Sequence, residues 1–168
     1  LSGYLGWDGI AHFDEVCRAQ GKGLFVLVHT SNPSAGELQH AELADGSNVA
    51  ARMAELVNDW AVAEGAQGTS GFSHIGAVVA PGNTARAYEL RRLMPHSIFL
   101  VPGFGAQGRS TEQVAACFHP DGGGALVNSS RGVINAYLEA SPGTGASWQD
   151  TVRTACAAFV TALRKINA

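Results

Sequence analysis

Residues 98–108 read Ile-Phe-Leu-Val-Pro-Gly-Phe-Gly-Ala-Gln-Gly, a short apolar run followed by a glycine-rich loop. Continuous apolar runs of this kind are typical of strands that are buried on both faces, as in parallel sheets. Three more runs have the same character, Leu24–Val28, Ile75–Ala80 and Ala125–Val127, and Gly, Pro, Asn or Ser is frequent in the loop after each. We therefore predict four buried parallel strands, the third of them at Ile98–Val101.

The segments before and between these runs have helical periodicity. Ile10, Phe13, Val16 and Cys17 can share one face of an early helix, and Val49–Trp60 predicts a second helix. The clearest pattern is in the last helix, where apolar residues recur at i, i+3, i+4 and i+7: Val152, Ala155, Cys156, Phe159, Val160, Leu163 and Ile166. Alternating strands and helices predict an α/β fold with a parallel sheet and right-handed crossovers, in a single domain over residues 1–168.

The composition excludes several classes of protein. Only 15% of the 168 residues are charged and the formal net charge is −3, with 11 basic residues. A protein that binds nucleic acid or an anionic membrane surface would carry a basic patch, so neither partner is expected. No apolar run approaches the roughly 18 residues of a membrane span. The three cysteines are far apart and no signal peptide is recognisable, which indicates a reducing, cytoplasmic compartment.

The loops that follow parallel strands meet at one edge of the sheet, where α/β proteins bind ligands. Two of these loops, residues 103–108 and 129–132, can together hold a phosphate group. Glycine lets backbone N–H groups approach an anion, a helix N-terminus adds a favourable dipole, the Gln107 amide donates a hydrogen bond, and the Arg131 guanidinium binds two phosphate oxygens. In TIM barrels, which are (β/α)8 folds, a phosphate often lies on the loops after strands seven and eight.

Other interpretations remain open at this point. The stretch from Gly103 to Gly108 matches the dinucleotide pattern GxGxxG, but two strand–helix units precede it. The position 20 residues beyond Gly108 is Asn128 rather than an acidic residue, although Arg131 could hold the 2′-phosphate of NADP. Ser31 either caps a turn or donates a hydrogen bond to a polar ligand. No histidine pairs with another ligand at i, i+4, so we expect no metal site.

Four segments carry a family resemblance. Residues 25–33 read Phe-Val-Leu-Val-His-Thr-Ser-Asn-Pro, residues 101–108 read Val-Pro-Gly-Phe-Gly-Ala-Gln-Gly, and residues 127–133 read Val-Asn-Ser-Ser-Arg-Gly-Val. Together with Tyr4-Leu-Gly-Trp-Asp8, in this order and spacing, they resemble orotidine 5′-phosphate decarboxylase in its type 2 bacterial branch. The Pro-Gly-x-Gly-Ala-Gln-Gly and Ser-Ser-Arg-Gly pieces are specific as a pair.

The resemblance implies a TIM barrel, a homodimer, and decarboxylation of orotidine 5′-monophosphate to uridine 5′-monophosphate without a cofactor. Carried over residue by residue, it implies that Gln107 and Arg131 hold the substrate 5′-phosphate, helped by backbone N–H groups near Gly108 and Ser130.

Two further site residues follow from the same resemblance. Ser31 would bond the amide edge of the pyrimidine, and Pro102 would line the apolar side near the leaving carboxylate. One departure is Val79-Ala-Pro-Gly82, where the family more often has Gly-Ala-Thr.

A larger departure concerns the catalytic lysine. The family places it in an Asp-x-Lys-x-x-Asp motif, whereas the lysines here, Lys22 and Lys165, have no Asp two residues before them. Four strands are also half of what closes a barrel of about 250 residues. We therefore expect this chain to supply roughly strands five to eight of a TIM barrel and to need the N-terminal half, which would carry the catalytic groups. The alternatives are another phosphate-binding barrel enzyme, such as a sugar-phosphate decarboxylase or isomerase, and a catalytically inactive half-barrel interaction module.

Overall fold

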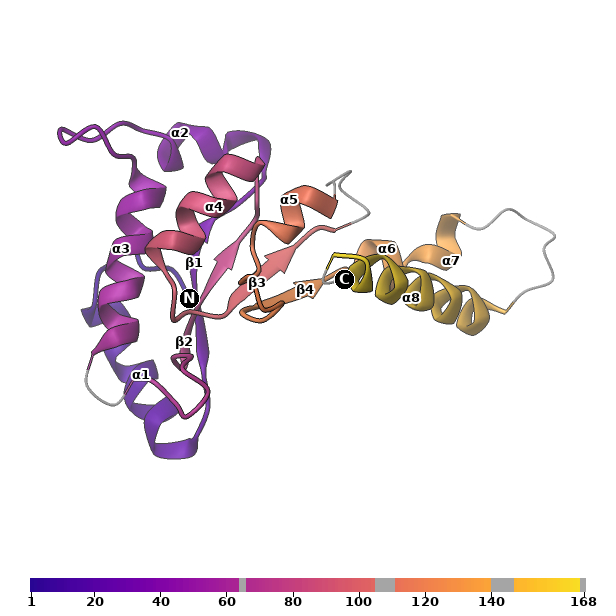
Figure 1. Cartoon of the computed structure of the whole chain (residues 1–168), viewed down its shortest axis with the longest axis horizontal. Helices are drawn as coiled ribbons and strands as arrows, with labels where there is room; N and C mark the ends of the chain where they lie inside the picture. The colour runs from indigo at the N-terminus through magenta and orange to yellow at the C-terminus, as the bar shows by residue number, and fades with distance from the viewer. Residues whose placement is uncertain (64–65, 105–110, 140–146, 167–168) are drawn as a thin grey trace.

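The computed structural model describes residues 1–63, 66–104, 111–139 and 147–166. Figure 1 shows helices α1, α3 and α4 packed beside a four-stranded sheet, with α6, α7 and α8 on the far side of β4. In chain order the elements are α1 (Asp8–Gln20), β1 (Leu24–His29), the 3-10 turn η1 (Pro33–Ala35), α2 (Gly36–Gln39), α3 (Val49–Val62), β2 (Ile75–Val79), α4 (Thr84–Leu93), β3 (Phe99–Pro102), α5 (Thr111–Ala115), β4 (Ala125–Asn128), α6 (Arg131–Ile134), α7 (Ala136–Glu139) and α8 (Trp148–Arg164).

The four predicted strands form one sheet in the order β1-β2-β3-β4, and every neighbouring pair is parallel. The prediction of a parallel α/β fold is confirmed, and strand boundaries differ from those expected by one residue. The register aligns one row across the sheet, because Leu27 pairs with Val78, Val78 with Leu100, and Leu100 with Leu126. Sequential parallel order with crossover helices is the arrangement of half a (β/α)8 barrel.

The first residues of the chain extend the sheet beyond β1. Ser2 forms a parallel bridge with Leu27, and the Leu27 amide donates to the Leu1 carbonyl oxygen at 2.8 Å. The ammonium group of Leu1 donates to the carbonyl oxygen of Phe25 at 2.7 Å. The edge of β1 is therefore covered by a short segment that runs parallel to it.

The two faces of the sheet differ in their cover. Val26, Ala77 and Val101 point toward the helical layer and are fully buried. On the other face, Leu27 is 43% exposed and Leu126 is 53% exposed. None of the described helices is both long and apolar enough to span a membrane. The described part of the chain thus buries one face of the sheet and leaves apolar side chains at both ends of the other.

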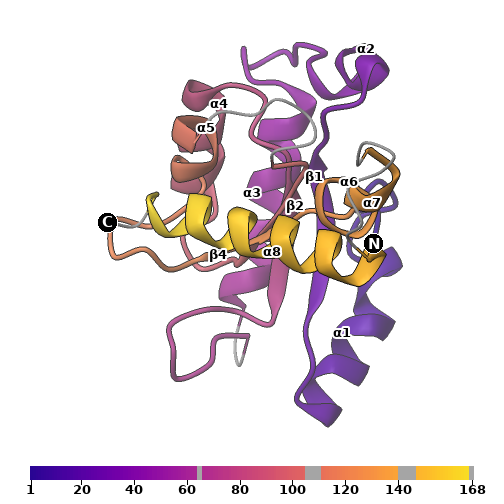
Figure 2. The same cartoon turned by 90° about the vertical axis from the view of Figure 1, so that its right-hand side faces the viewer.

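Both the early and the last predicted helix are present, but each buries only part of its apolar face. In α1, Ile10 and Cys17 are buried, but Phe13 and Val16 are more than half exposed, because Asp14 occupies the buried position between Ile10 and Cys17. In α8 the predicted helix is present, yet none of its described residues is fully buried. The helix contacts mainly the short helices α6 and α7, and Figure 1 and Figure 2 show all three lying beyond β4, away from α1 and α3. Only its last turns, from Phe159 onward, pack against the core.

A buried arginine joins the second half of the sheet to its helices. Arg91 of α4 is 7% exposed, and its guanidinium donates hydrogen bonds to four backbone carbonyl oxygens. The acceptors belong to Met94, Ser97, Cys117 and Gly124, at 2.8–3.1 Å. Its Cζ atom also lies 3.4 Å from the centroid of the Phe99 ring. Burial lowers the pKa of Arg91 to about 10, which still leaves the group charged at neutral pH.

We expect Arg91→Met to destabilise the fold by at least about 3 kcal/mol, because it leaves several buried carbonyl oxygens without a donor. Urea denaturation followed by circular dichroism measures the change. Arg92→Met, at the exposed neighbouring position, is the matched control and should change stability little. Equal losses in the two variants would contradict the role assigned to Arg91.

Candidate active site

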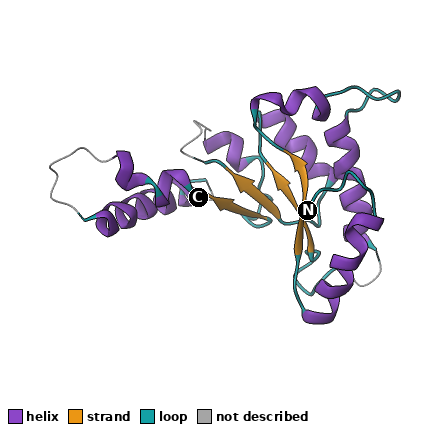
Figure 3. Cartoon of the chain, turned by 180° about the vertical axis from the view of Figure 1, so that it is seen from behind, coloured by secondary structure: helices purple, strands orange, loops and turns teal. Residues whose placement is uncertain are grey.

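The carboxyl ends of the parallel strands bring most of the predicted site residues to one edge of the sheet. The arrowheads in Figure 3 mark this edge. Ser31 is exposed two residues after β1, Pro102 is the half-buried last residue of β3, and Ser130 and Arg131 follow β4. Gln107 and Gly108 lie outside the described residues, so the structure does not test their place in the site.

Pro102 and Arg131 come from adjacent strands. Pro102 pairs with Asn128 in the β3–β4 register, and the amide of Gly103 donates to the carbonyl oxygen of Asn128 at 3.3 Å. Arg131 follows Asn128 by three residues, is exposed, and forms no ion pair with the residues that the structure describes. The apolar ring of Pro102, at the end of β3, and the positive charge of Arg131, after β4, therefore belong to neighbouring strand ends.

Ser130 precedes α6, and its carbonyl oxygen accepts a hydrogen bond from the amide of Ile134 at 2.7 Å. Its side chain does not cap the helix. Since α6 has only four residues, the helix dipole expected at this loop is small. Among the described residues directly after β4, the group that would attract an anion is therefore the guanidinium of Arg131 rather than the N-terminus of α6.

Side-chain bonds that the sequence did not predict connect the loops at this edge. The buried His29, at the end of β1, lies with its Nδ1 atom 2.6 Å from the carbonyl oxygen of Ala80, after β2. The amide of Gln113 in α5 donates to the carbonyl oxygen of Gly82 at 3.0 Å. Asn83 caps α4 by accepting from the amide of Arg86. The bonds of His29 and Gln113 join residues far apart in the sequence, so pattern analysis could not find them, whereas the Asn83 cap has a local signature, an Asn directly before a helix.

Comparison with known proteins agrees with this geometry. A protein of Rhodopirellula baltica named orotidine 5′-phosphate decarboxylase is 43% identical over 158 residues, which are 92% of this chain and 51% of that protein. The protein of the same name from Caldicellulosiruptor bescii is 42% identical over 134 residues, covering 80% of this chain and 43% of that one. The structure of Leishmania donovani OMP decarboxylase matches with a TM-score of 0.73 at 25% identity, over 99% of this chain and 55% of that one.

The chain is a homologue of the orotidine 5′-phosphate decarboxylases. No protein-family model matches it. The chain spans about half the length of the curated relatives that it matches. The predicted resemblance is therefore confirmed, and the half coverage agrees with a four-stranded half of a barrel.

The two lysines of the chain lie outside the loops that directly follow the four strands. Lys22 stands between α1 and β1, at the amino ends of the strands, and Lys165 directly follows α8 and is exposed. Neither lysine stands in the Asp-x-Lys-x-x-Asp motif of the family, so the absence of that motif stays the basis for expecting the catalytic lysine elsewhere.

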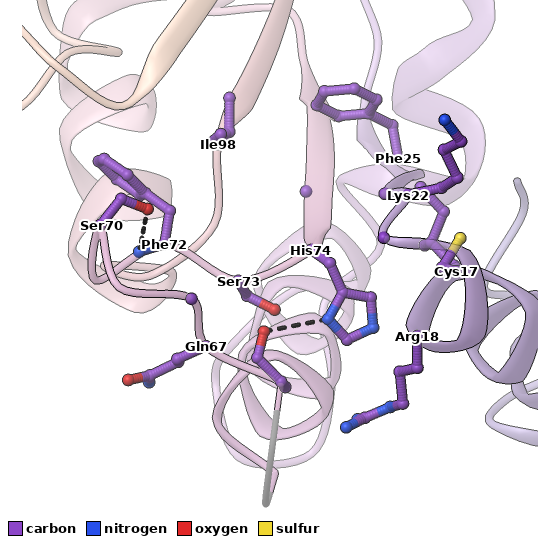
Figure 4. A pocket seen from close by; sticks show the side chains of 16 residues that line it. Cys17, Arg18, Lys22, Phe25, Gln67, Ser70, Phe72, Ser73, His74 and Ile98 are labelled. Atoms are coloured by element: carbon purple, nitrogen blue, oxygen red, sulfur yellow. Dashed lines mark hydrogen bonds between the residues drawn. The ribbon is translucent and has the colours of Figure 1, made fainter.

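A cavity of about 660 Å³ opens at the opposite, amino edge of the sheet, and none of the predicted site residues lines it. Figure 4 shows Phe25 and Ile98 on its sheet side and Arg18, Lys22 and His74 around its rim. Loops at the amino ends of barrel strands serve stability rather than catalysis. In this homologue of the decarboxylases, the cavity is therefore distinct from the candidate active site.

Beside this cavity, a buried carboxylate joins α1 to the segment before β2. Asp14 accepts from Arg18 Nε at 2.7 Å and lies 2.6 Å from His74 Nε2. The other ring nitrogen of His74 faces the carbonyl oxygen of Ala66 at 3.0 Å. Burial acts to raise the pKa of Asp14, but the hydrogen bonds and charges of Arg18 and His74 outweigh it and hold that pKa below its usual value.

We expect Asp14 to contribute stability that is present above the unfolded-state pKa of about 4 and is lost as pH falls through the lower folded-state pKa. The difference in unfolding free energy between the wild type and Asp14→Asn should therefore be largest near pH 6 and shrink toward pH 3. Urea denaturation across this range measures it. Asp59→Asn, at an exposed carboxylate, is the control. A difference that stays constant with pH would refute the assignment.

Proposed function

We propose that this chain forms the phosphate- and pyrimidine-binding half of an enzyme that decarboxylates orotidine 5′-monophosphate to uridine 5′-monophosphate. The observation that carries the proposal is the 43% identity, over 92% of the chain, with a protein named orotidine 5′-phosphate decarboxylase. The parallel sheet supports it, since Ser31, Pro102 and Arg131 all follow or end strands at one edge.

The phosphate is held at the ends of β3 and β4 in this proposal. Arg131 supplies a fixed positive charge and a forked donor that matches two phosphate oxygens. The amide of Gln107 and backbone N–H groups near Gly108 and Ser130 complete the grip. Arg131 is suited to this role because no described carboxylate neutralises it.

The pyrimidine lies toward β1 and β3. Ser31 bonds the amide edge of the base, and Pro102 forms an apolar wall near the departing carboxylate. An apolar wall disfavours the charged carboxylate relative to neutral CO₂, because burying an unpaired charge is costly.

Loss of CO₂ leaves a carbanion-like carbon on the pyrimidine. The reaction needs no cofactor if an ammonium group held by carboxylates stabilises this charge and then delivers a proton. Lys22 lies at the amino edge, and neither Lys22 nor Lys165 stands in the Asp-x-Lys-x-x-Asp motif of the family, so the proton donor comes from outside residues 1–168 in this proposal. The phosphate grip, remote from the reacting carbon, supplies binding energy that organises the site.

The missing half covers the open face of the sheet. Parallel sheets are normally covered on both faces, whereas Leu27 and Leu126 are about half exposed. We propose that four further strands close the barrel over this face, that residues 1–168 act as one structural unit, and that the complete enzyme is a homodimer. The free thiols of Cys17, Cys117 and Cys156 fit a cytoplasmic location.

A chimera tests the proposed activity. Residues 1–168 replace the matching half of the Rhodopirellula baltica protein, which supplies the remaining strands. We expect the chimera to release CO₂ from orotidine 5′-monophosphate and the isolated 168-residue chain to release none, because the chain lacks the Asp-x-Lys-x-x-Asp motif. A folded chimera without activity, when the parent protein is active, would overturn the proposal.

The phosphate role is tested by Arg131→Ala in the same chimera. A charge-assisted hydrogen bond contributes about 1.5–3 kcal/mol, so kcat/KM for orotidine 5′-monophosphate should fall by about 10- to 100-fold. The reaction of orotidine, which has no phosphate, should change little. Arg153→Ala, at an exposed arginine of α8 that pairs with Asp150, is the control. Equal losses with both substrates would show that Arg131 does not bind the phosphate.

A further inference from the structure

The short helix α2 ends in a glutamine that is bonded twice to the loop after β1. The amide of Thr30 donates to Gln39 Oε1 at 2.9 Å, and Gln39 Nε2 donates to Thr30 Oγ1 at 2.7 Å. The Thr30 N–H can only donate, so it fixes which end of the Gln39 side chain faces it. Gln39 therefore closes a two-point contact with a single residue of this loop.

Asn32, the residue after Ser31 in the same loop, is also held by a hydrogen bond. The hydroxyl of Thr30 donates to Asn32 Oδ1 at 2.6 Å, across Ser31. Asn32 is extended, as expected for a residue before proline. Gln39 Nε2 donates to the oxygen of this hydroxyl, so the single proton of the hydroxyl is directed to Asn32. Both neighbours of Ser31 are thus held through one side chain.

The residue directly after the helix, His40, strengthens this attachment. His40 Nε2 lies 3.3 Å from His29 Nε2, and the two rings stack with centroids 5.6 Å apart. His29 in turn contacts the carbonyl oxygen of Ala80 through Nδ1. Two consecutive residues, Gln39 and His40, therefore contact two consecutive residues, Thr30 and His29, so that α2 is fastened to the end of β1.

From this geometry we infer that Gln39 is a positioning residue, which orients Ser31 toward the base of the nucleotide through Thr30. The inference rests on the proposed function, in which Ser31 bonds the pyrimidine. Gln39 itself does not contact the ligand. Its effect should therefore concern recognition of the base and leave the phosphate, which is held three strands away at Arg131, unaffected.

The test uses the 168-residue chain and Gln39→Met, which keeps the length of the side chain but removes its hydrogen bonds. Glu37→Met, at an exposed position of the same helix, is the matched control. Titration calorimetry compares uridine 5′-monophosphate with ribose 5-phosphate, which has the phosphate but no base. We expect Gln39→Met to weaken binding of the nucleotide about fivefold or more and to leave ribose 5-phosphate binding unchanged.

Amide hydrogen exchange gives a second, ligand-free measurement. The Thr30 amide should exchange about tenfold faster or more in Gln39→Met than in the wild type or Glu37→Met, since it loses its acceptor. The Phe99 amide, which donates to the carbonyl oxygen of Gly124, should keep its protection and so report that the variant is folded.

The outcomes separate the inference from the proposed function. Equal weakening of both ligands, or an unchanged preference for the nucleotide, overturns the positioning role while the proposed function stands. If the wild type does not prefer the nucleotide to ribose 5-phosphate, the proposed role of Ser31 fails, and faster exchange at Thr30 would then reveal Gln39 as only a structural contact.

Discussion

The position of β4 depends on the hydrogen bonds that the guanidinium of Arg91 donates to the backbone before this strand. The connection from α5 to β4 has little regular structure, and its carbonyl groups at Cys117 and Gly124 are bonded to this one side chain. Gly124 has a φ of 80°, and a Cβ atom there would lie 2.2 Å from His119. Gly124, in a left-handed conformation and bonded through its carbonyl oxygen to Arg91, fixes the start of β4. The four residues of β4 then set the position of Arg131 at the other end of the strand.

The second constraint is that the sheet is covered on one side only. Strands that are apolar on both faces are normally covered on both faces. Leu27 and Leu126, at the two ends of one row across the sheet, are instead about half exposed. The same incompleteness explains α8, whose apolar face meets the core only near its end. The chain matches about half the length of its relatives, and one face of its sheet is partly exposed. Both observations agree with a sheet that forms half of a barrel.

Sequence patterns predicted what depends on periodicity. The apolar runs located all four strands within a residue, and the loop composition identified the edge that carries Ser31, Pro102 and Arg131. The patterns failed where one polar residue replaces an apolar one inside a face, as Asp14 does in α1.

Sequence patterns also could not reveal Arg91 or Gln39. An arginine at the end of a helix and a glutamine in a polar loop are ordinary surface residues until tertiary structure brings backbone carbonyl or N–H groups to them. The glycine-rich loop that contains Gln107 was recognised by motif alone, and its role remains a prediction.

The order of the strands also bears on the choice between ligands. Ser31 follows β1 and Arg131 follows β4, so the two strand ends that precede them are three strand spacings apart, about 14 Å at about 4.8 Å per spacing. A ligand that contacts both must carry an anion at one end and a hydrogen-bonding group at the other. A nucleoside monophosphate has this form, with the ribose between the phosphate and the base. In the proposed function, where Ser31 and Arg131 hold one ligand, a short sugar phosphate would reach Arg131 and leave Ser31 without a role, so that proposal favours a nucleotide over the smaller substrates of other phosphate-binding barrels.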